Sequence, residues 1–162
     1  MKKLFCFLLF GMVILTGTVA CSKEAVNEEE VMELVKEYKT KQYTIKDPDK
    51  APTGPEIGEE VKSCFSKDEF DRQMANRSFS LAPDIAKKTN KSIALTDIKL
   101  RKEKENDDGT VNYTYTLELK FYDDQTSEVI EKNGQLSISN DDGLKIARDW
   151  EDRTTQVEGE IF

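Results

Sequence analysis

Residues 111–121 carry the most regular pattern in the sequence, and this pattern constrains the fold more than any other feature. Large apolar residues alternate there with polar ones: Val111, Tyr113, Tyr115, Leu117, Leu119 and Phe121. A period of two residues is typical of a β-strand with one buried and one solvated face. We therefore expect a long strand in an antiparallel sheet that is covered on one side only.

Turn signals on either side of this strand predict a meander of four strands. Asn106–Gly109 and Asn140–Gly143 are both Asn-Asp-Asp-Gly, which is typical of a hairpin turn, and residues 123–126 form the turn between them. The first strand starts at Ser92, and its apolar residues change phase near Thr96 and Asp97, which indicates a β-bulge. The third strand, residues 127–139, is expected to bend or break at residues 133–134. In the last strand Leu144, Ile146, Arg148 and Trp150 share one face, which places the Trp150 indole in the core.

Helical patterns precede the sheet. Asn27 is expected to cap a helix that ends near Thr40, and Ser66 a second helix that ends near residues 76–77. Short helical pieces are expected at residues 59–65 and 83–88. Residues 47–58 contain three prolines and two glycines, which favours a non-helical segment, either a connecting loop or a lid over a pocket.

Helices followed by an antiparallel meander predict an α+β fold, with N-terminal helices packed on a curved sheet. The order of elements over residues 27–152 resembles the cone-shaped fold of nuclear transport factor 2 and its bacterial relatives. The closing stretch Gly143-Leu144-Lys145-Ile146-Ala147-Arg148-Asp149-Trp150 is also similar to that family's ending, with Leu144 at the usual Trp position. The resemblance implies a cone, whose interior holds a carboxylate or imidazole in the enzymes of the family.

The first 21 residues indicate export. Lys2 and Lys3 precede an apolar run over residues 4–15, and Val19-Ala20-Cys21 follows. The run is shorter than the about 20 residues that a membrane-spanning helix needs. The segment resembles a bacterial lipoprotein signal, which implies lipidation of Cys21 after cleavage and attachment to the outer face of the cell membrane. We expect a signal peptide at residues 1–20, a tether at 21–26, one domain at 27–152 and a charged tail at 153–162.

Composition limits the chemistry. The net charge is −8, and removal of residues 1–20 takes away two lysines and no acid, so the mature chain carries −10. This charge opposes binding to nucleic acid. The absence of histidine excludes Ser-His and Cys-His catalysis and His-ligated zinc. Cys64 is the one thiol left after lipidation, and it is expected to be a small buried residue, with a reactive thiol as the alternative.

Candidate site residues are few. Tyr113, Tyr115, Arg148 and Trp150 are the candidates for lining a pocket inside the cone, and Arg148 either pairs there with an anionic ligand or reaches solvent at the sheet edge. The two acidic turns are expected at the same end of the sheet, where four carboxylates (Asp107, Asp108, Asp141, Asp142) suit calcium. Because Asp-Gly is ordinary turn chemistry, we predict solvated loops instead. We predict no catalytic, metal-binding or cofactor-binding residues.

Three functions remain open. The first is a non-enzymatic, membrane-tethered lipoprotein that binds an unidentified protein or other component of the cell envelope, with no cofactor and no nucleic acid. The second is a small-ligand-binding protein that uses the interior of the cone. The third is an isomerase- or dehydratase-like enzyme that uses carboxylate or tyrosine chemistry. A filled cone favours the first, an open cavity the second, and a buried carboxylate in that cavity the third.

Overall fold

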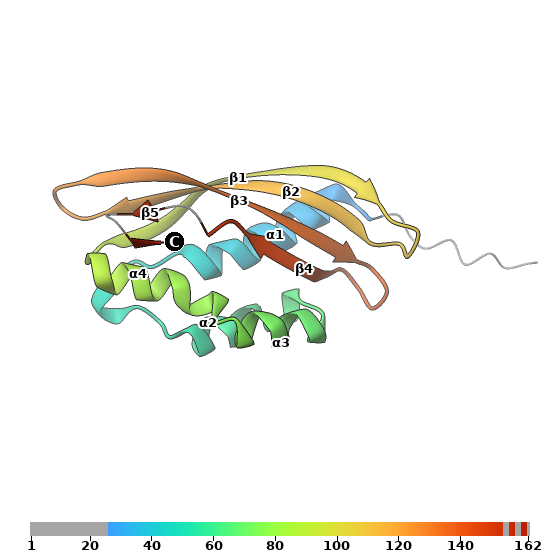
Figure 1. The fold of residues 1–162 in the computed structure, drawn as a ribbon, viewed down its shortest axis with the longest axis horizontal. Coiled ribbons are helices and arrows are strands. Elements are labelled where there is room, and N and C mark those ends of the chain that lie inside the picture. Colours follow the sequence, from blue (N-terminus) through green and yellow to red (C-terminus); the bar gives the residue numbers. More distant parts are fainter. Residues whose placement is uncertain (1–25, 154–155, 158–159, 162) are drawn as a thin grey trace, which may run out of the picture.

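A curved antiparallel sheet and a set of helices against its concave side form the two layers of the protein (Figure 1). The computed structural model describes residues 26–153, 156–157 and 160–161. The sheet contains β1 (Ser92–Glu105), β2 (Val111–Tyr122), β3 (Ser127–Ser139) and β4 (Lys145–Glu151) in the order β1-β2-β3-β4. The predicted α+β architecture, helices followed by a curved meander, is confirmed.

The helices begin and end at residues with clear capping chemistry. α1 (Glu28–Tyr43) begins after Asn27, whose side-chain oxygen accepts a hydrogen bond from the Glu29 N–H, and it runs three residues beyond the predicted end. α3 (Lys67–Ala75) begins after Ser66, as predicted. α4 (Leu81–Thr89) is longer than the predicted turn, and Asn90 ends it in the left-handed conformation with φ 54°.

The prediction that residues 47–58 are non-helical is wrong. Pro48–Lys50 form a short 3-10 helix, and α2 (Gly54–Val61) begins inside the segment. Thr53 and Glu56 make a reciprocal capping box, and Pro55 lies in the first turn, where its missing N–H costs no hydrogen bond. Two further 3-10 turns, Lys62–Cys64 and Ser78–Ser80, connect the helices.

The sheet contains three bulges or irregularities: two between β1 and β2, at Leu95–Asp97 and Lys102–Lys104, and one between β3 and β4. The register between β1 and β2 shifts between Leu95 and Asp97, which confirms the bulge predicted near Thr96. β3 is continuous through residues 133–134, so the predicted break is absent from this strand. Gly134 lies opposite Tyr115, and a Cβ on it would come within 2.2 Å of the Tyr115 ring. The glycine therefore makes room for the tyrosine instead of breaking the strand.

The second important bulge lies in β4 and corrects the predicted orientation of that strand. Ser137 pairs with Arg148 and Ile138 pairs with Ile146, so Ala147 is the extra residue. After Ala147 the alternation is reversed: Asp149 points into the molecule, whereas Arg148 and Trp150 point outward. The prediction of a buried Trp150 is therefore wrong, since 53% of this residue is exposed.

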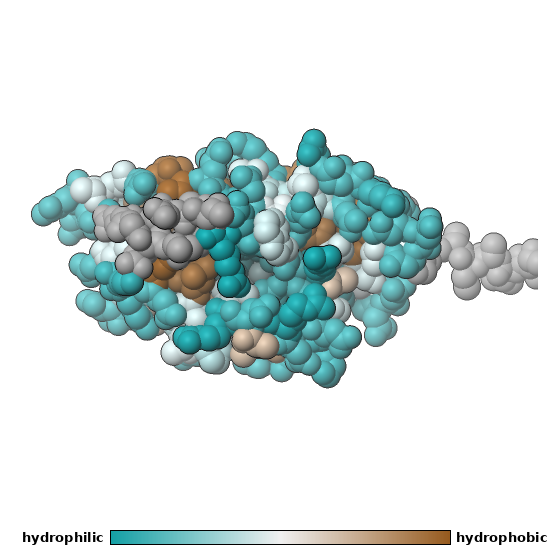
Figure 2. Space-filling view, viewed as in Figure 1, coloured by the Kyte–Doolittle hydropathy of each residue, from teal (hydrophilic) through white to brown (hydrophobic). Residues whose placement is uncertain are grey.

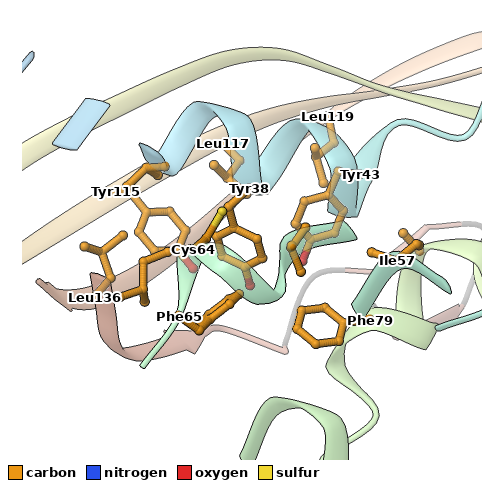
Figure 3. Packing of buried hydrophobic residues seen from close by; sticks show 14 of the residues in the cluster. Tyr38, Tyr43, Ile57, Cys64, Phe65, Phe79, Tyr115, Leu117, Leu119 and Leu136 are labelled. Atoms are coloured by element: carbon orange, nitrogen blue, oxygen red, sulfur yellow. The ribbon is translucent and has the colours of Figure 1, made fainter. Parts of the chain in front are cut away.

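The core fills the space between the sheet and the helices. All six apolar residues of the 111–121 pattern are buried, as predicted. Aromatic rings from α1 and the following segments, among them Tyr38, Phe65 and Phe79, pack edge to face in the same cluster of buried side chains (Figure 3). Cys64 is buried in this cluster, as predicted, and burial raises the pKa of its thiol.

Residues 156–157 and 160–161 pair as the short antiparallel strands β5 (Gln156–Val157) and β6 (Glu160–Ile161). The predicted division between the domain and a charged tail at residue 153 stays a prediction. None of the helices in the described ranges is long and apolar enough to span a membrane.

Candidate functional site

The four candidate pocket residues are divided between the two faces of the sheet. Tyr113 and Tyr115 point inward from β2 and are almost fully buried. Arg148 and Trp150 lie on the outer face, so they do not line the interior together with the tyrosines. Cys21, the predicted lipidation site, lies outside the described residues, and its role stays a prediction.

A buried polar cluster lies where α1 meets the C-terminal end of β4, and the sequence had not indicated it. We call it the Lys39 cluster, after the ammonium group at its centre. Its members are Tyr38, Lys39, Gln42 and Tyr43 from α1, Tyr115 from β2, and Asp149 and Glu151 from β4. The β4 bulge is what turns the two carboxylates toward α1.

The Lys39 ammonium group bonds to both carboxylates. Its Nζ atom lies 2.7 Å from Asp149 Oδ2, also contacts Glu151 Oε1, and donates to Gln42 Oε1 at 3.3 Å. It also lies 4.2 Å from the ring centre of Tyr38 and 4.8 Å from that of Tyr115. A fully buried lysine is rare unless it is paired, and these contacts supply the pairing.

Tyrosine hydroxyls also donate hydrogen bonds to both carboxylates. Tyr38 donates to Asp149 Oδ2 at 2.8 Å, and Tyr115 donates to Asp149 Oδ1 at 2.8 Å. Tyr43 donates to Glu151 Oε2, and the Tyr115 hydroxyl also lies 3.1 Å from Glu151 Oε1. Each of the four carboxylate oxygens therefore has at least one partner from this chain.

A second group of charges joins the cluster to α3. The carboxylate of Glu69 accepts the Asp149 backbone N–H at 2.9 Å and the Gln73 amide at 2.6 Å, and its other oxygen lies 2.6 Å from Arg72. Gln73 in turn donates to the Asp149 carbonyl at 2.8 Å. These bonds hold the bulged part of β4 against α3.

Lys132 approaches the Lys39 cluster from β3. Its ammonium group donates to the Asp152 carbonyl at 2.7 Å and lies 4.0 Å from Glu151. The buried Lys39 and Lys132 thus face Asp149 and Glu151, and the buried Glu69 is paired with the exposed Arg72. Balanced, hydrogen-bonded charges are the condition under which ionised groups are tolerated in a protein interior.

The electrostatics follow from this geometry. Burial, followed by the negative charges of Asp149 and Glu151, raises the pKa of Tyr38 and Tyr115 well above the ordinary value. Burial and Glu151 do the same to the pKa of Tyr43. Burial acts to raise the pKa of Glu151, but the ammonium groups of Lys39 and Lys132 outweigh it, and this pKa is lowered. Burial lowers the pKa of Lys132.

These features favour a structural role for the Lys39 cluster over a catalytic one. A general base needs a free lone pair within reach of a substrate, and the carboxylate oxygens here already accept bonds from lysine and tyrosine. Among the described residues, no group of three or more His, Cys, Asp or Glu side chains is arranged to hold a metal ion.

The turns at Asp107–Asp108 and Asp141–Asp142 lie at the same end of the meander and are exposed. The absence of a calcium site there stays a prediction.

Three hollows surround Trp150. A groove of about 520 Å³ lies beside the Lys39 cluster and is lined by Gln42, Gln73, Asp149 and Trp150, among others. Two hollows of about 480 and 340 Å³ lie on the outer face of the sheet. Trp150 lines all three hollows. The residue that was expected in the core therefore lies at the surface, between these three hollows.

Sequence reasoning missed Lys39, Asp149 and Glu151. Without a bulge at Ala147, the alternation of β4 places Asp149 and Glu151 on the face opposite its apolar residues, and so outside the interior. One signal was present in α1: Tyr38, Lys39, Gln42 and Tyr43 lie at helical spacing on one face, and all four are buried. A lysine and a glutamine between two tyrosines on the buried face of a helix indicate buried acceptors opposite.

Comparison with known proteins identifies similar folds. No family model matches the chain, and no curated protein matches it. An IcmL-like type IV secretion system protein from Legionella pneumophila is 13% identical, with a TM-score of 0.57 over 80% of this chain and 94% of that one. The putative transfer protein TraH from the Gram-positive conjugative plasmid pIP501 is 18% identical, with a TM-score of 0.55 over 85% of this chain and all of that one.

A further solved structure, an Ntf2-like protein involved in plasmid conjugation, is 9% identical, with a TM-score of 0.48 over 80% of this chain and 50% of that one. At such identities, similarity of structure concerns the path of the chain and leaves function open. What the likenesses to the IcmL-like protein and to TraH establish is therefore the fold: helices packed on a curved antiparallel sheet.

Proposed function

We propose that this protein is a lipid-anchored, extracytoplasmic lipoprotein whose domain is a non-enzymatic interaction module of a conjugative transfer or type IV secretion apparatus. The observation that carries the proposal is that the interior of the cone is filled and its buried charges are paired within the chain. Among the described residues, the buried carboxylates of Glu69, Asp149 and Glu151 are all engaged by partners from the same chain, so we expect the domain to act through its surface.

The likenesses support the choice of apparatus. The IcmL-like protein belongs by its description to a type IV secretion system, and TraH to a conjugative plasmid. This chain spans 94% and 100% of those two structures, so the shared fold is the whole of each domain and not a fragment of it.

The N-terminal sequence supports the location. Lys2-Lys3, the apolar run and Val19-Ala20-Cys21 fit a lipoprotein signal. Two acyl chains on Cys21 hold a protein stably at a membrane, whereas one chain binds marginally. Only residues 22–26 separate Cys21 from Asn27, the N-cap of α1, so an extended tether spans about 17 Å and keeps the domain close to the membrane.

The anchor is tested by mass spectrometry of the N-terminal peptide of the full chain from its native host. The expected peptide begins at a diacylated Cys21, and Cys21→Ala is expected to abolish the modification. An unmodified Cys21, or a chain that begins elsewhere, overturns the lipoprotein assignment.

The interaction role is tested by chemical crosslinking on intact cells, followed by purification of the full chain and identification of the attached proteins. Envelope components of a transfer or secretion channel are expected, in amounts that fall with Cys21→Ala. If the same cells yield only cytoplasmic proteins, or the yield is equal with and without crosslinker, the proposal is wrong.

The groove beside the Lys39 cluster favours a second candidate, a small-ligand-binding protein. The groove has a volume of about 520 Å³, and buried Gln42, Gln73 and Asp149 contribute to its lining. A polar ligand of modest size would fit these groups. Saturable heat on titration with a library of small polar metabolites, abolished by Gln73→Leu, would favour this candidate over the first.

A further inference from the structure

We propose that the outer face of the sheet around Trp150 is the docking surface for an acidic, extended segment of a partner protein. We call this surface the Trp150 face and define it by Arg101, Thr114, Gln135, Arg148 and Trp150. The proposal rests on the proposed function, since it names the surface and the chemistry through which an interaction module of this fold would act.

The first argument is the exposure of Trp150. It is the one tryptophan of the chain, it is 53% exposed, and it stands on a sheet whose outer face is otherwise largely polar. Trp150 and Val129 are the large apolar residues that the described part of the chain exposes. Tryptophan and arginine are the residues most enriched among those that dominate binding energy, and Trp150 has an arginine two residues before it on the same face.

The second argument is shape. The hollow of about 340 Å³ lies between Trp150 and the β1 residues Arg101 and Glu103, with Gln135 and Thr114 in its floor. The hollow of about 480 Å³ continues along the same strands toward Lys99 and Asn133. Together they form a shallow depression beside Trp150 on the outer face, lined by residues from all four strands of the sheet. A depression of this form suits a short extended segment with one apolar side chain against the indole.

The third argument is charge. The chain has a net charge of −8 and five arginines, and two of them, Arg101 and Arg148, line the same hollow of the Trp150 face. Arg148 makes no ion pair within the described residues, whereas Arg101 lies 2.6 Å from Glu103. Hydrophilic residues cover most of the face of the molecule that Figure 2 shows. The guanidinium group of Arg148 can offer two parallel N–H donors to the carboxylate of another protein.

These arguments favour an acidic protein segment over nucleic acid. A phosphate backbone places closely spaced negative charges along its whole length, and binding requires a continuous basic track. Here Glu103, Glu118 and Asp152 lie along the edges of the same hollows or beside them, and they would repel such a backbone. An acidic peptide needs only two or three carboxylates, spaced to meet the arginines, and tolerates this mixture of charges.

The first test is photo-crosslinking in the native host with the full-length protein. The crosslinking residue p-benzoylphenylalanine replaces Gln135 at the centre of the Trp150 face, or Val129 at the other end of β3 as the matched control. We expect a crosslinked peptide of net negative charge from another protein at position 135 and none at 129. Arg148→Glu is expected to reduce the yield about tenfold, as loss of a complementary charge does.

A crosslink to a peptide without acidic residues, to lipid or to nucleic acid would overturn the proposal, as would equal yields at the two positions. If the proposed transfer role were wrong but the docking surface right, the acidic peptide would come from a protein outside any transfer apparatus. The two failures are therefore distinguishable.

The second test uses the fluorescence of Trp150, the single tryptophan, in the purified full chain. The probe is a nonapeptide with a central leucine between two runs of four glutamates, and the control peptide has glutamines in their place. We expect a saturable shift with the acidic peptide, weakened about tenfold for the glutamine peptide and for Arg148→Gln. A flat titration, equal binding of both peptides, or tighter binding of an oligothymidine of twelve nucleotides contradicts the proposal.

Discussion

The replacement of Lys39 by methionine tests most directly whether the Lys39 cluster stabilises the fold. Lys39 is fully buried, and its ammonium group contacts Asp149 and Glu151 at once. Methionine has a similar length and no charge, so the substitution leaves two carboxylates in the interior with one positive group, Lys132, 4.0 Å from Glu151. Breaking a buried ion pair on one side costs about 3–5 kcal/mol, because the remaining charge loses its compensation.

Urea unfolding followed by far-ultraviolet circular dichroism measures this cost. Domains of this size have a total stability of about 5–15 kcal/mol, so the expected loss is a large part of it. Lys41→Met is the matched control: Lys41 lies on the same helix and forms an exposed i,i+4 pair with Glu37, which predicts a loss below about 1 kcal/mol. Equal losses for Lys39→Met and Lys41→Met would refute the account of the cluster.

The pH dependence gives a second measure of the same variant. The lowered pKa of Glu151 means that its contribution to stability is present above the ordinary pKa of glutamate and is lost as the pH falls through the folded-state value. Lys39→Met removes this contribution at neutral pH. The stability difference between parent and Lys39→Met should therefore shrink below about pH 4. A difference that stays constant down to acid unfolding would contradict the assignment of the charge to Glu151.

Three further predictions concern the sheet and the tyrosines. Gly134→Ala places a Cβ 2.2 Å from the Tyr115 ring and should cost about 1–3 kcal/mol in urea titration; a variant as stable as the parent would contradict the close approach. The pKa values of Tyr38, Tyr43 and Tyr115 are raised, so above about pH 10 the folded state keeps tyrosine protons that the unfolded state loses. The free energy of unfolding should therefore fall above this pH by about 1.4 kcal/mol per pH unit for each of the three tyrosines. Tyrosinate absorbance should accordingly appear together with unfolding and not before it. Trp150→Ala should cost less than the about 3–5 kcal/mol of a buried aromatic residue, measured by urea unfolding.

The sheet could be predicted from sequence wherever a strand keeps one phase. The strict alternation of residues 111–121 left one register in which six apolar residues are buried together, and β2 has that register. The bulge at Thr96 was also detectable, because two apolar pairs on either side of it are out of phase. The prediction is correct here because a shift of one residue in register would expose all six apolar side chains.

The end of β4 could not be predicted in the same way. Leu144, Ile146 and Trp150 marked one phase for the strand, and a single extra residue at Ala147 is enough to exchange the two faces of everything that follows. The exchange is stabilised by Lys39, which lies 110 residues away in the sequence. No local pattern contains that information. A strand without the bulge at Ala147 places Trp150 in the interior and Asp149 at the surface, the reverse of what the structure has.

The start of α2 was missed for a different reason. Three prolines and two glycines favoured a loop, but Pro55 occupies a position in the first turn of a helix where proline is tolerated, and Thr53 and Glu56 supply the capping box. The capping chemistry was visible in the sequence and was outweighed by the count of helix-breaking residues.

We propose that this protein serves a transfer or secretion apparatus of the cell envelope through its surface. The most direct measurement is the frequency of conjugative transfer from a host in which the gene is deleted and then restored. Transfer is expected to fall on deletion and to return with the wild-type chain, but not with the Trp150→Ala/Arg148→Glu variant at equal abundance. Unchanged transfer after deletion, or full restoration by that variant, would contradict the account.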